Sequence, residues 1–265
     1  MTAVERSQTT ASVPSEPNDD EMSVVDVLKR AVIGFVVLVV GLSLLGGVGA
    51  LVFDGAIGDA EADFVTWVAE QRAGVLDTVA NNASSLSDTW TVIGVVVGAV
   101  TMLWAAGHTR YAATVVLAIL FEFGTFLVVG AVIGRSRPDV EALGSTPSTP
   151  SFPSGHTAAA FVIYGSLVFV ARSLSSQSSA SQPSASQSSA SQLSASQGWS
   201  TRSIPRSVWL VPLFLALLVA AARVYEGVHY PTDVAAGLLL GIGAVVAASV
   251  ATGLTDLPGT PGRTR

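Results

Sequence analysis

Three short polar stretches of this chain carry side chains that can act together on an anion. They comprise Arg135-Ser136-Arg137-Pro138, then Pro153-Ser154-Gly155-His156, and finally Arg223 followed by His229 and Asp233. Each stretch stands at the end of an apolar segment. Guanidinium groups pair in bidentate fashion with phosphate oxygens, and a histidine can transfer a proton or attack phosphorus. The combination predicts a site that handles a phosphate group.

The arginines supply positive charge. Arg137 and Arg223, together with Arg135, are predicted to bind phosphate oxygens and to spread the charge that develops during phosphoryl transfer. An arginine that ends a membrane helix often only anchors that helix in the lipid headgroups. We favour phosphate binding because the topology derived below brings the three stretches together.

The second stretch leads directly into an apolar segment, which places Ser154 as the N-cap of a helix. The amides of Gly155 and His156 then point outward as donors, and such a helix terminus binds anions. A plain capping turn needs no histidine. His156 is therefore predicted to protonate a leaving oxygen.

The third stretch precedes the last apolar segment. Pro231 suits the first turn of a helix and favours extended backbone at Tyr230, so His229 is expected just outside that helix. Asp233 then lies in the first turn, where it can bond one imidazole nitrogen and leave the other nucleophilic. The aspartate of a Ser-His-Asp triad has the same orienting role.

The composition indicates an integral membrane protein, because 50% of the 265 residues are hydrophobic and only 12% are charged. The apolar runs, each near the length that crosses about 30 Å of hydrocarbon, cover 31–53, 89–106, 111–133, 157–171, 207–222 and 234–254. We expect an all-α, polytopic bundle of six transmembrane helices. The net charge of −6, with Lys29 as the single lysine, argues against nucleic-acid binding and is typical of a high-salt organism. The absence of cysteine excludes disulfides and thiol catalysis.

The distribution of basic residues predicts the orientation in the membrane. A cytoplasmic N-terminus puts on the inside Lys29, Arg30, Arg110, Arg172, Arg202, Arg206, Arg263 and Arg265, and on the outside only Arg72, Arg135, Arg137 and Arg223. This satisfies the positive-inside rule. We expect a multi-pass cell-membrane protein with both termini cytoplasmic and with the loops 134–156 and 223–233 outside, so that one site forms at the extracytoplasmic face.

The polar segments complete the predicted organisation. It comprises a disordered tail (1–22), helices one to four with the first two stretches (23–172), a Ser/Gln-rich cytoplasmic linker (173–206), helices five and six with the third stretch (207–254) and a C-terminal tail (255–265). The linker contains four tandem pentapeptides over 178–197. Residues 59–80 fit an amphipathic helix along the outer interface, either a lid or an ordinary packed loop helix.

Glu122 lies in the middle of the third span, where an acid is a functional hypothesis by default. It is about 13 residues from Arg135, or about 20 Å along a helix at 1.5 Å per residue, which we take as too far for phosphate chemistry. We favour a protonated or hydrogen-bonded interior residue over a proton path. The pairs Gly94-x-x-x-Gly98 and Gly237-x-x-x-Gly241 are candidate close-packing surfaces.

The polar stretches resemble the type 2 phosphatidic acid phosphatase (PAP2) family, the lipid-phosphatase relatives of the vanadium haloperoxidases. The family pattern is a lysine, six residues and Arg-Pro, then Pro-Ser-Gly-His, then Ser-Arg, five residues, His, three residues and Asp. Matching positions here are Arg137-Pro138, all of Pro153 to His156, and Arg223, His229 and Asp233. Two positions depart from the pattern, because Gly130 replaces the lysine and Ala222 replaces the serine. The resemblance covers roughly residues 85 to 252.

The resemblance implies a phosphatase that acts on a lipid phosphate or polyprenyl diphosphate at the outer leaflet and needs neither metal nor cofactor. It implies that His229 forms a phosphohistidine, that Asp233 orients it, and that His156 protonates the departing alkoxide and later activates water. By the same resemblance the phosphate oxygens are held by Arg137, Arg223 and the Ser154–Gly155 turn, with Arg135 assisting.

Three alternatives remain open at this stage. His156, His229 and Asp233 could bind zinc, although converging arginines would repel a dication. A binding or channel-like relative could have lost activity, for which Gly130 is the best argument. A lipid phosphotransferase could use the same site, with a second hydroxyl replacing water as the acceptor.

Overall fold

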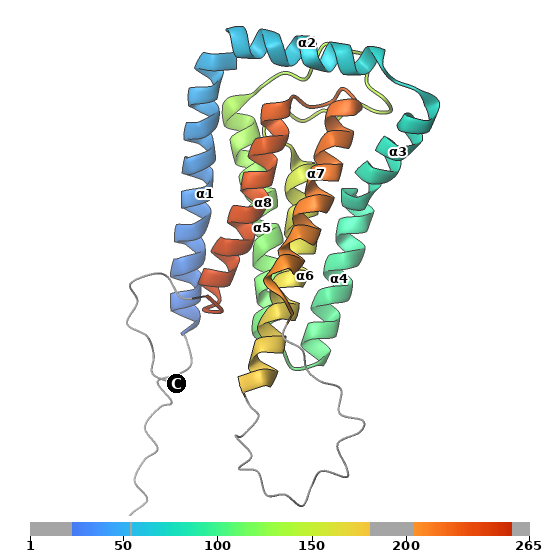
Figure 1. Ribbon diagram of the computed structural model, residues 1–265. Helices are drawn as coiled ribbons and strands as arrows, with labels where there is room; N and C mark the ends of the chain where they lie inside the picture. Colours follow the sequence, from blue (N-terminus) through green and yellow to red (C-terminus); the bar gives the residue numbers. More distant parts are fainter. Residues whose placement is uncertain (1–22, 54, 181–203, 256–265) are drawn as a thin grey trace, which may run out of the picture.

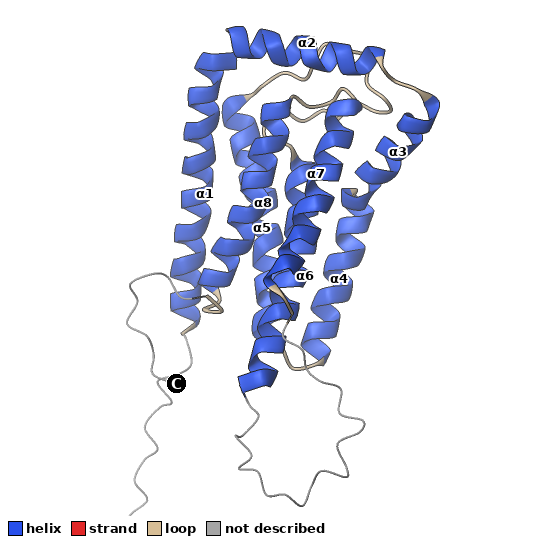
Figure 2. Ribbon diagram, in the orientation of Figure 1, coloured by secondary structure: helices blue, strands red, loops and turns tan. Residues whose placement is uncertain are grey.

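Residues 23–53, 55–180 and 204–255 are described by the structure, which is a computed structural model of the chain (Figure 1). Every regular element in these ranges is helical (Figure 2). Six helical segments there are long and apolar enough to cross a membrane. The expected all-α architecture with six spans is therefore confirmed.

The helices in chain order are α1 (Val24–Phe53), α2 (Ala56–Glu70), α3 (Gly74–Ser84), η1 (Ser85–Ser87), α4 (Thr89–Ala105), α5 (Thr109–Ile133), α6 (Gly155–Ala180), η2 (Arg206–Trp209), α7 (Leu210–Tyr225) and α8 (Pro231–Ala251). The apolar runs predicted the spans well, with two differences. The first span begins at Val24 rather than at residue 31, and the second covers Gly74–Ala105 because α3, η1 and α4 follow one another with only Asp88 between the last two.

Six of these helices, α1 and α4 to α8, run side by side as a bundle, and α2 lies across one end of it (Figure 1). We call this the α2 end. The loops that join α5 to α6 and α7 to α8 both lie there. The three polar stretches therefore share one end of the bundle, as expected.

Local sequence explains the helix ends that carry the polar stretches. Gly134 ends α5 in the left-handed conformation, with φ of 63°, which glycine adopts without steric cost. Pro231 begins α8, and the Asp233 carboxylate accepts a hydrogen bond from the Tyr230 amide at 2.9 Å. This bond completes a capping box, so Asp233 lies in the first turn as predicted.

The amphipathic segment 59–80 is divided between α2 and α3, so the prediction of one continuous helix was wrong. The break lies at Arg72, whose Nε donates to the Tyr225 carbonyl at 3.1 Å. The Ala73 amide donates to the Tyr225 hydroxyl at 3.1 Å. These tertiary contacts turn the chain from the end of the bundle to its side.

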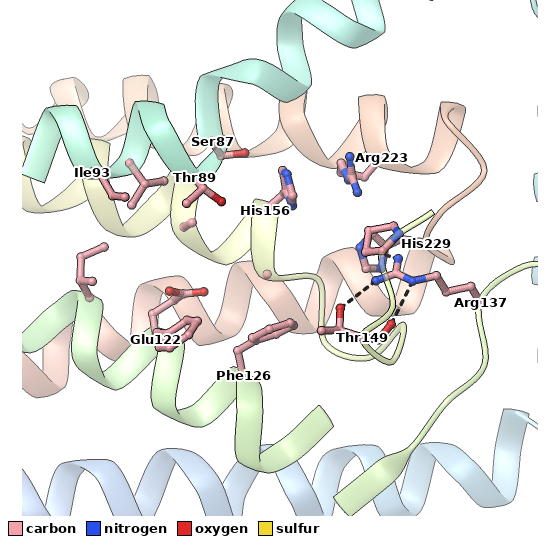
Figure 3. Close-up of a pocket in the computed structure, with 16 residues that line it drawn as sticks. Ser87, Thr89, Ile93, Glu122, Phe126, Arg137, Thr149, His156, Arg223 and His229 are labelled. Carbon is pink, nitrogen blue, oxygen red and sulfur yellow. Dashed lines mark hydrogen bonds between the residues drawn. The ribbon is translucent and has the colours of Figure 1, made fainter. Parts of the chain in front are cut away.

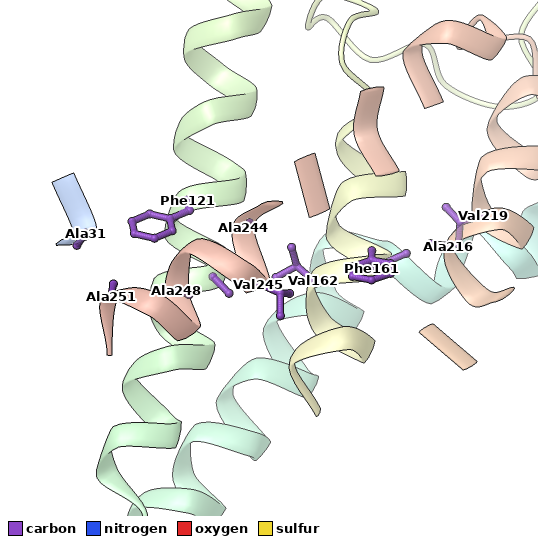
Figure 4. Close-up of a cluster of buried hydrophobic side chains, with 12 residues drawn as sticks. Ala31, Phe121, Phe161, Val162, Ala216, Val219, Ala244, Val245, Ala248 and Ala251 are labelled. Carbon is purple, nitrogen blue, oxygen red and sulfur yellow. The ribbon is translucent and has the colours of Figure 1, made fainter. Parts of the chain in front are cut away.

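Small side chains bring the helices close together in the core. The largest buried cluster joins α1, α5, α6, α7 and α8 and contains Ala31, Ala118, Phe121, Ala160, Phe161, Val162, Ala216, Val219, Ala244, Val245, Ala248 and Ala251 (Figure 4). A methyl group at Gly237 would collide with the Ser154 carbonyl oxygen, and one at Gly241 would lie 2.7 Å from the Ala158 carbonyl oxygen. The glycines of α8 therefore form a close-packing surface against α6.

Three other predictions concern the Gly94–Gly98 pair, the linker and the two tails. A methyl group added at Gly94 or Gly98 would meet no atom of another described residue within 4 Å, so the prediction of close packing there was wrong. Helix α6 continues to Ala180, so residues 173–180, which were expected in the linker, are helical. The predicted tails 1–22 and 256–265 and most of the pentapeptide repeats, from residue 181 on, lie outside the described residues.

Candidate active site

A cavity of about 430 Å³ lies inside the bundle near the α2 end (Figure 3). Its polar lining includes Arg137, Thr149, His156, Arg223 and His229. Its apolar lining includes Val92, Ile93, Ile119, Phe123, Phe126 and Ala159. The cavity thus joins a cationic end, formed by the polar stretches, to an apolar end between α4 and α5.

The structure brings five of the eight predicted site residues to this cavity, namely Arg137, Gly155, His156, Arg223 and His229. The other three, Arg135, Ser154 and Asp233, do not line it and lie behind its wall. The first group is placed to touch a substrate, whereas the second is placed to hold the first.

His229 lies in the turn between α7 and α8 and is only 2% exposed. Its Nδ1 lies 3.6 Å from Asp233 Oδ2, which is longer than a hydrogen bond, and its Nε2 lies 3.4 Å from Arg137 Nη1. Burial lowers the pKa of the His229 imidazole, and the two nearby arginines lower it further, against the opposing effect of Asp233. The ring is therefore neutral at neutral pH, with its Nε2 directed toward the cationic end of the cavity.

Asp233 is fully buried and is fixed by several donors. Its Oδ2 accepts hydrogen bonds from the Tyr230 amide and the Ser151 hydroxyl. Its Oδ1 accepts one from Arg135 Nη1 at 2.6 Å. The carboxylate that faces His229 is thus held from three sides. Sequence reasoning missed Ser151, since no spacing rule connects it to α8.

Arg135 was expected to bind phosphate, but its guanidinium is turned away from the cavity. It donates to Asp233, to the Thr232 hydroxyl at 2.8 Å and to Glu61 Oε2 at 2.9 Å. It also lies 4.1 Å from the centre of the Tyr230 ring. The geometry therefore favours a positioning role for Arg135.

Glu61 is a buried carboxylate on α2 that sequence reasoning missed. In addition to the bond from Arg135, the Glu61 carboxylate accepts hydrogen bonds from the Thr232 amide at 2.7 Å and from the Thr232 hydroxyl at 3.0 Å. The only sequence signal was an acid on the same helical face as Val65, four residues later. Through Glu61, α2 is connected to Arg135 and Thr232 and so to the residues that hold His229.

Arg137 lies at the cavity wall and is held mainly by carbonyl oxygens. Its Nε donates to the Thr149 carbonyl at 3.1 Å and its Nη1 to the Val228 carbonyl at 2.6 Å. Burial, with the nearby Arg223, lowers the pKa of Arg137 to about 10, so the group stays charged at neutral pH. Within the described part of the chain no carboxylate lies within ion-pair distance of Arg137. Its charge is available to an anion in the cavity.

Arg223 is buried and is held on one side only. Its Nη1 donates to Glu226 Oε2 at 2.7 Å and to the Ser84 hydroxyl at 3.0 Å. Its Nε is buried without a hydrogen-bond partner among the described residues. Sequence reasoning missed Glu226 and Ser84, which orient this arginine toward the cavity.

His156 lies in the first turn of α6, and its Nε2 is 3.4 Å from Asp88 Oδ1. Asp88 precedes α4 directly and is about half exposed. The prediction had no partner for His156, although an aspartate placed before an apolar run was visible in the sequence. Each of the two histidines is thus paired with a different aspartate.

Ser154 and Gly155 have different places at the start of α6. The Ser154 hydroxyl accepts a hydrogen bond from the Thr157 hydroxyl at 3.1 Å, and its amide donates to the Asp233 carbonyl at 2.9 Å. Gly155 lines the cavity and packs on Phe126, whose ring would lie 3.2 Å from an added methyl group. Ser154 therefore joins α6 to α8. Gly155, which has no side chain, leaves room for the Phe126 ring where α6 begins at the cavity wall.

The zinc alternative finds no support in the geometry of the donors. No group of three or more His, Cys, Asp or Glu side chains is placed to hold a metal ion within residues 23–53, 55–180 and 204–255. His156 and His229 face different carboxylates, and Arg137 lies beside His229. The donor set suits an anion better than a cation.

The two positions that depart from the family pattern, Gly130 and Ala222, are both buried in helix packing. Gly130 is buried on α5, where a methyl group would lie 3.7 Å from the Phe152 carbonyl oxygen. Ala222 is buried between α7 and α3 against Ala80 and Ala83. At position 222 a small apolar side chain therefore fits the packing of these two helices.

Glu122 lines the same cavity as the two histidines, which its distance from Arg135 along the helix did not indicate. The expected distance was counted along α5 to Arg135. The loop after α5 instead folds back, so that α6 starts beside Phe126, one turn from Glu122. Glu122 therefore belongs to the apolar end of the cavity.

Comparison with curated proteins finds three informative relatives. The chain is 28% identical over 148 residues to the bacitracin transport permease protein BcrC of Bacillus licheniformis, which covers 52% of this chain and 56% of that protein. It is 31% identical over 131 residues to phosphatidylglycerophosphatase B of Bacillus subtilis, covering 48% and 52%. It is 51% identical over 37 residues to an undecaprenyl-diphosphatase of Sulfolobus acidocaldarius, covering 14% and 18%. The chain thus spans about half or less of the length of these relatives.

The fold is similar to the crystal structure of a transmembrane PAP2 type phosphatidylglycerolphosphate phosphatase from Bacillus subtilis. The TM-score is 0.61 at 22% identity, and the match covers 80% of this chain and 94% of that chain. The PAP2 superfamily model matches residues 107–254, more than half of the chain, and this range contains all three polar stretches. The chain, whose three polar stretches gather around one cavity, therefore belongs to the PAP2 superfamily.

Proposed function

We propose that the protein is a lipid phosphatase that transfers the phosphoryl group of a lipid phosphate monoester or polyprenyl diphosphate first to His229 and then to water. The observation that carries this proposal is the placement of a buried, neutral His229 between Asp233 and Arg137, at the cationic end of a cavity whose other end is apolar.

In the first step Nε2 of His229 attacks phosphorus and the bond from phosphorus to the lipid oxygen breaks. His156 gives a proton to the departing oxygen, which leaves as an alcohol or a lipid monophosphate. Asp233 pairs with the Nδ1 proton of His229 and balances the positive charge that the ring acquires. Arg137 and Arg223 stabilise the charge on the equatorial oxygens.

In the second step His156, now neutral, takes a proton from water, and the water oxygen attacks the phosphohistidine. The bond from nitrogen to phosphorus breaks, inorganic phosphate leaves, and both histidines return to their starting protonation. Asp88 lies 3.4 Å from Nε2 of His156, where its carboxylate can accept a hydrogen bond from the ring in the first step. No metal ion takes part in this scheme.

Arg135 and Glu61 are assigned to positioning in this scheme. Arg135 bonds the Asp233 oxygen that does not face His229, and Glu61 holds Arg135 in turn. Gly155 and the start of α6 supply backbone donors at the cationic end. The Ser154 hydroxyl is assigned to the support of α6.

A membrane lipid is the proposed substrate because the apolar end of the cavity reaches the lipid-facing surface. Ile93 of α4 and Phe123 of α5 line the cavity and are also 45% and 55% exposed. An acyl or prenyl chain can pass between these helices while its phosphate binds among the arginines. The basic-residue distribution supports an extracytoplasmic site with cytoplasmic termini.

The test is phosphate release by the purified full-length protein from phosphatidate, phosphatidylglycerol phosphate and a polyprenyl diphosphate in detergent micelles. We expect activity that survives excess EDTA and falls with vanadate, which can copy five-coordinate phosphorus. His229→Ala should form no phosphoenzyme, whereas His156→Ala should form it slowly, most of all with poor leaving groups. Inactivity on the whole panel, or loss on chelation with recovery by zinc, contradicts the proposal. Recovery of phosphate on an added alcohol instead of in solution identifies a phosphotransferase.

A further inference from the structure

Glu122 is a buried acid for which the proposed mechanism has no use. It is 5% exposed, it lies in the membrane-spanning part of α5, and it lines the cavity. No hydrogen bond or ion pair joins its carboxyl group to another residue in the part of the chain that the structure describes. A buried carboxyl group without a partner is costly, so its presence in a cavity wall points to a ligand.

Glu122 lies beside the part of the cavity that the leaving group of the substrate would occupy. Figure 3 shows Glu122 on α5 beside Phe126, on the side of the cavity away from Arg137 and His229. Phe126 packs on Gly155 at the start of α6, so Glu122 lies one helical turn, about 5.4 Å, deeper in the bundle. With phosphorus beside His229, the atoms that follow the ester oxygen pass Glu122 before they reach the lipid-facing opening.

The surroundings of Glu122 define which group it can bind. The neighbouring lining residues Ile119, Phe123 and Ile93 are apolar, and Glu122 is the one carboxyl group among the described residues that line the cavity. A hydroxyl group suits this place, because it donates to a carboxylate and accepts from a carboxylic acid. A second phosphate would be repelled by the carboxylate, and a plain hydrocarbon would leave the carboxyl group without a partner.

We infer that Glu122 binds a free hydroxyl group on the leaving side of the substrate and thereby selects lipid phosphates with a free hydroxyl beside the phosphate ester over polyprenyl diphosphates. The inference rests on the proposed function, since it takes phosphate to bind at the cationic end. A hydroxyl on the carbon next to the ester carbon, as in a monoacylglycerol 3-phosphate with a free 2-hydroxyl, is the simplest group of this kind.

The experiment compares two substrates that differ by one oxygen atom. One is a monoacylglycerol 3-phosphate with a free 2-hydroxyl, and the other is its 2-deoxy analogue with the same acyl chain. The full-length protein is assayed in detergent micelles as the wild type and as Glu122→Leu, Glu122→Gln and Thr125→Val. Thr125 is the matched control, since it is a buried polar residue on α5 that does not line the cavity.

We expect the wild type to prefer the hydroxylated substrate by about 10- to 100-fold in kcat/KM, as for a buried hydrogen bond to a substrate hydroxyl. Glu122→Leu should bring this ratio close to one, and Glu122→Gln should keep part of it because an amide still bonds a hydroxyl. Thr125→Val should keep the wild-type ratio. The same Glu122→Leu variant should gain relative activity on a polyprenyl diphosphate.

The outcomes separate this inference from the proposed function. If the wild type hydrolyses both substrates equally well, or if Glu122→Leu keeps the preference, Glu122 does not bind the hydroxyl and the inference fails while the phosphatase stands. If the wild type releases phosphate from neither substrate, nor from the wider lipid panel, the proposed function itself has failed.

Discussion

Replacing Arg135 with alanine separates a positioning residue from a phosphate ligand. Its guanidinium bonds Asp233 at 2.6 Å and Glu61 at 2.9 Å, and the three side chains are 10%, 0% and 8% exposed. Arg135→Ala leaves these two buried carboxylates without that cation. Removing one partner from a buried ion pair typically costs about 3–5 kcal/mol of folding free energy. We therefore expect a clear fall in thermal stability.

The effect on the reaction follows from the oxygen that Arg135 contacts. In Arg135→Ala, Oδ2 of Asp233, which faces His229, keeps the hydrogen bonds from Ser151 and Tyr230. Only Oδ1 loses a donor, the Arg135 guanidinium. Loss of one charge-assisted hydrogen bond, worth about 1.5–3 kcal/mol, corresponds to a decrease of roughly 10- to 150-fold if all of it is expressed in the transition state. The decrease should appear in kcat.

The assay measures kcat, KM and the inhibition constant for vanadate in Arg135→Ala, Arg135→Lys and Arg137→Ala. Arg135→Ala should leave vanadate inhibition near that of the wild type, whereas Arg137→Ala should weaken it. Arg135→Lys keeps a charge near the carboxylates and should recover part of the stability. If Arg135→Ala weakens vanadate inhibition as much as Arg137→Ala does, Arg135 touches the phosphate and the positioning argument is refuted.

Three further predictions concern the pH dependence, the packing and the topology. The pKa of His229 is lowered from its ordinary value of about 6.5, and only the neutral ring attacks, so the acid limb of the profile of kcat/KM against pH should lie below pH 6.5. Gly237→Ala should destabilise the protein by about 1–3 kcal/mol in thermal unfolding through its collision with α6, whereas Gly94→Ala, in open space, should be neutral or stabilising. Cysteines placed at the exposed positions Ser148 and Ser207 should differ, the first reacting with an impermeant thiol reagent in intact cells and the second only after lysis; the reverse result overturns the orientation.

The membrane spans could be predicted because hydrophobic length is a local property of the chain. Each apolar run became a helix, and Gly134 and Pro231 marked helix ends through their own backbone preferences. The break at Arg72 could not be predicted, because it depends on a carbonyl group 153 residues away. No pattern within the segment 59–80 distinguishes one helix from two.

The residue types that gather around the candidate site could be predicted from the sequence, but most of their partners could not. Arg135 stands two residues before Arg137 and has the same chemistry, yet its partner Glu61 is 74 residues away and turns it out of the cavity. The place of Glu122 in the cavity wall could not be predicted, because a distance along one helix says nothing about where the next helix begins. Roles that depend on a distant partner were out of reach of the sequence.

Under the proposed function, the contact between Gly237 and Ser154 has a consequence for how the range of substrates can change. Helix α6 has His156 in its first turn, and α8 begins at Pro231, two residues after His229. The close contact between the two helices therefore fixes the spacing between the two histidines. Side-chain replacements elsewhere in the cavity leave that spacing in place. The apolar end, in contrast, is built from exchangeable side chains such as Ile93 and Phe123. Substitutions there can admit a different lipid while the geometry of phosphoryl transfer stays the same, which allows one chemistry to serve many lipids.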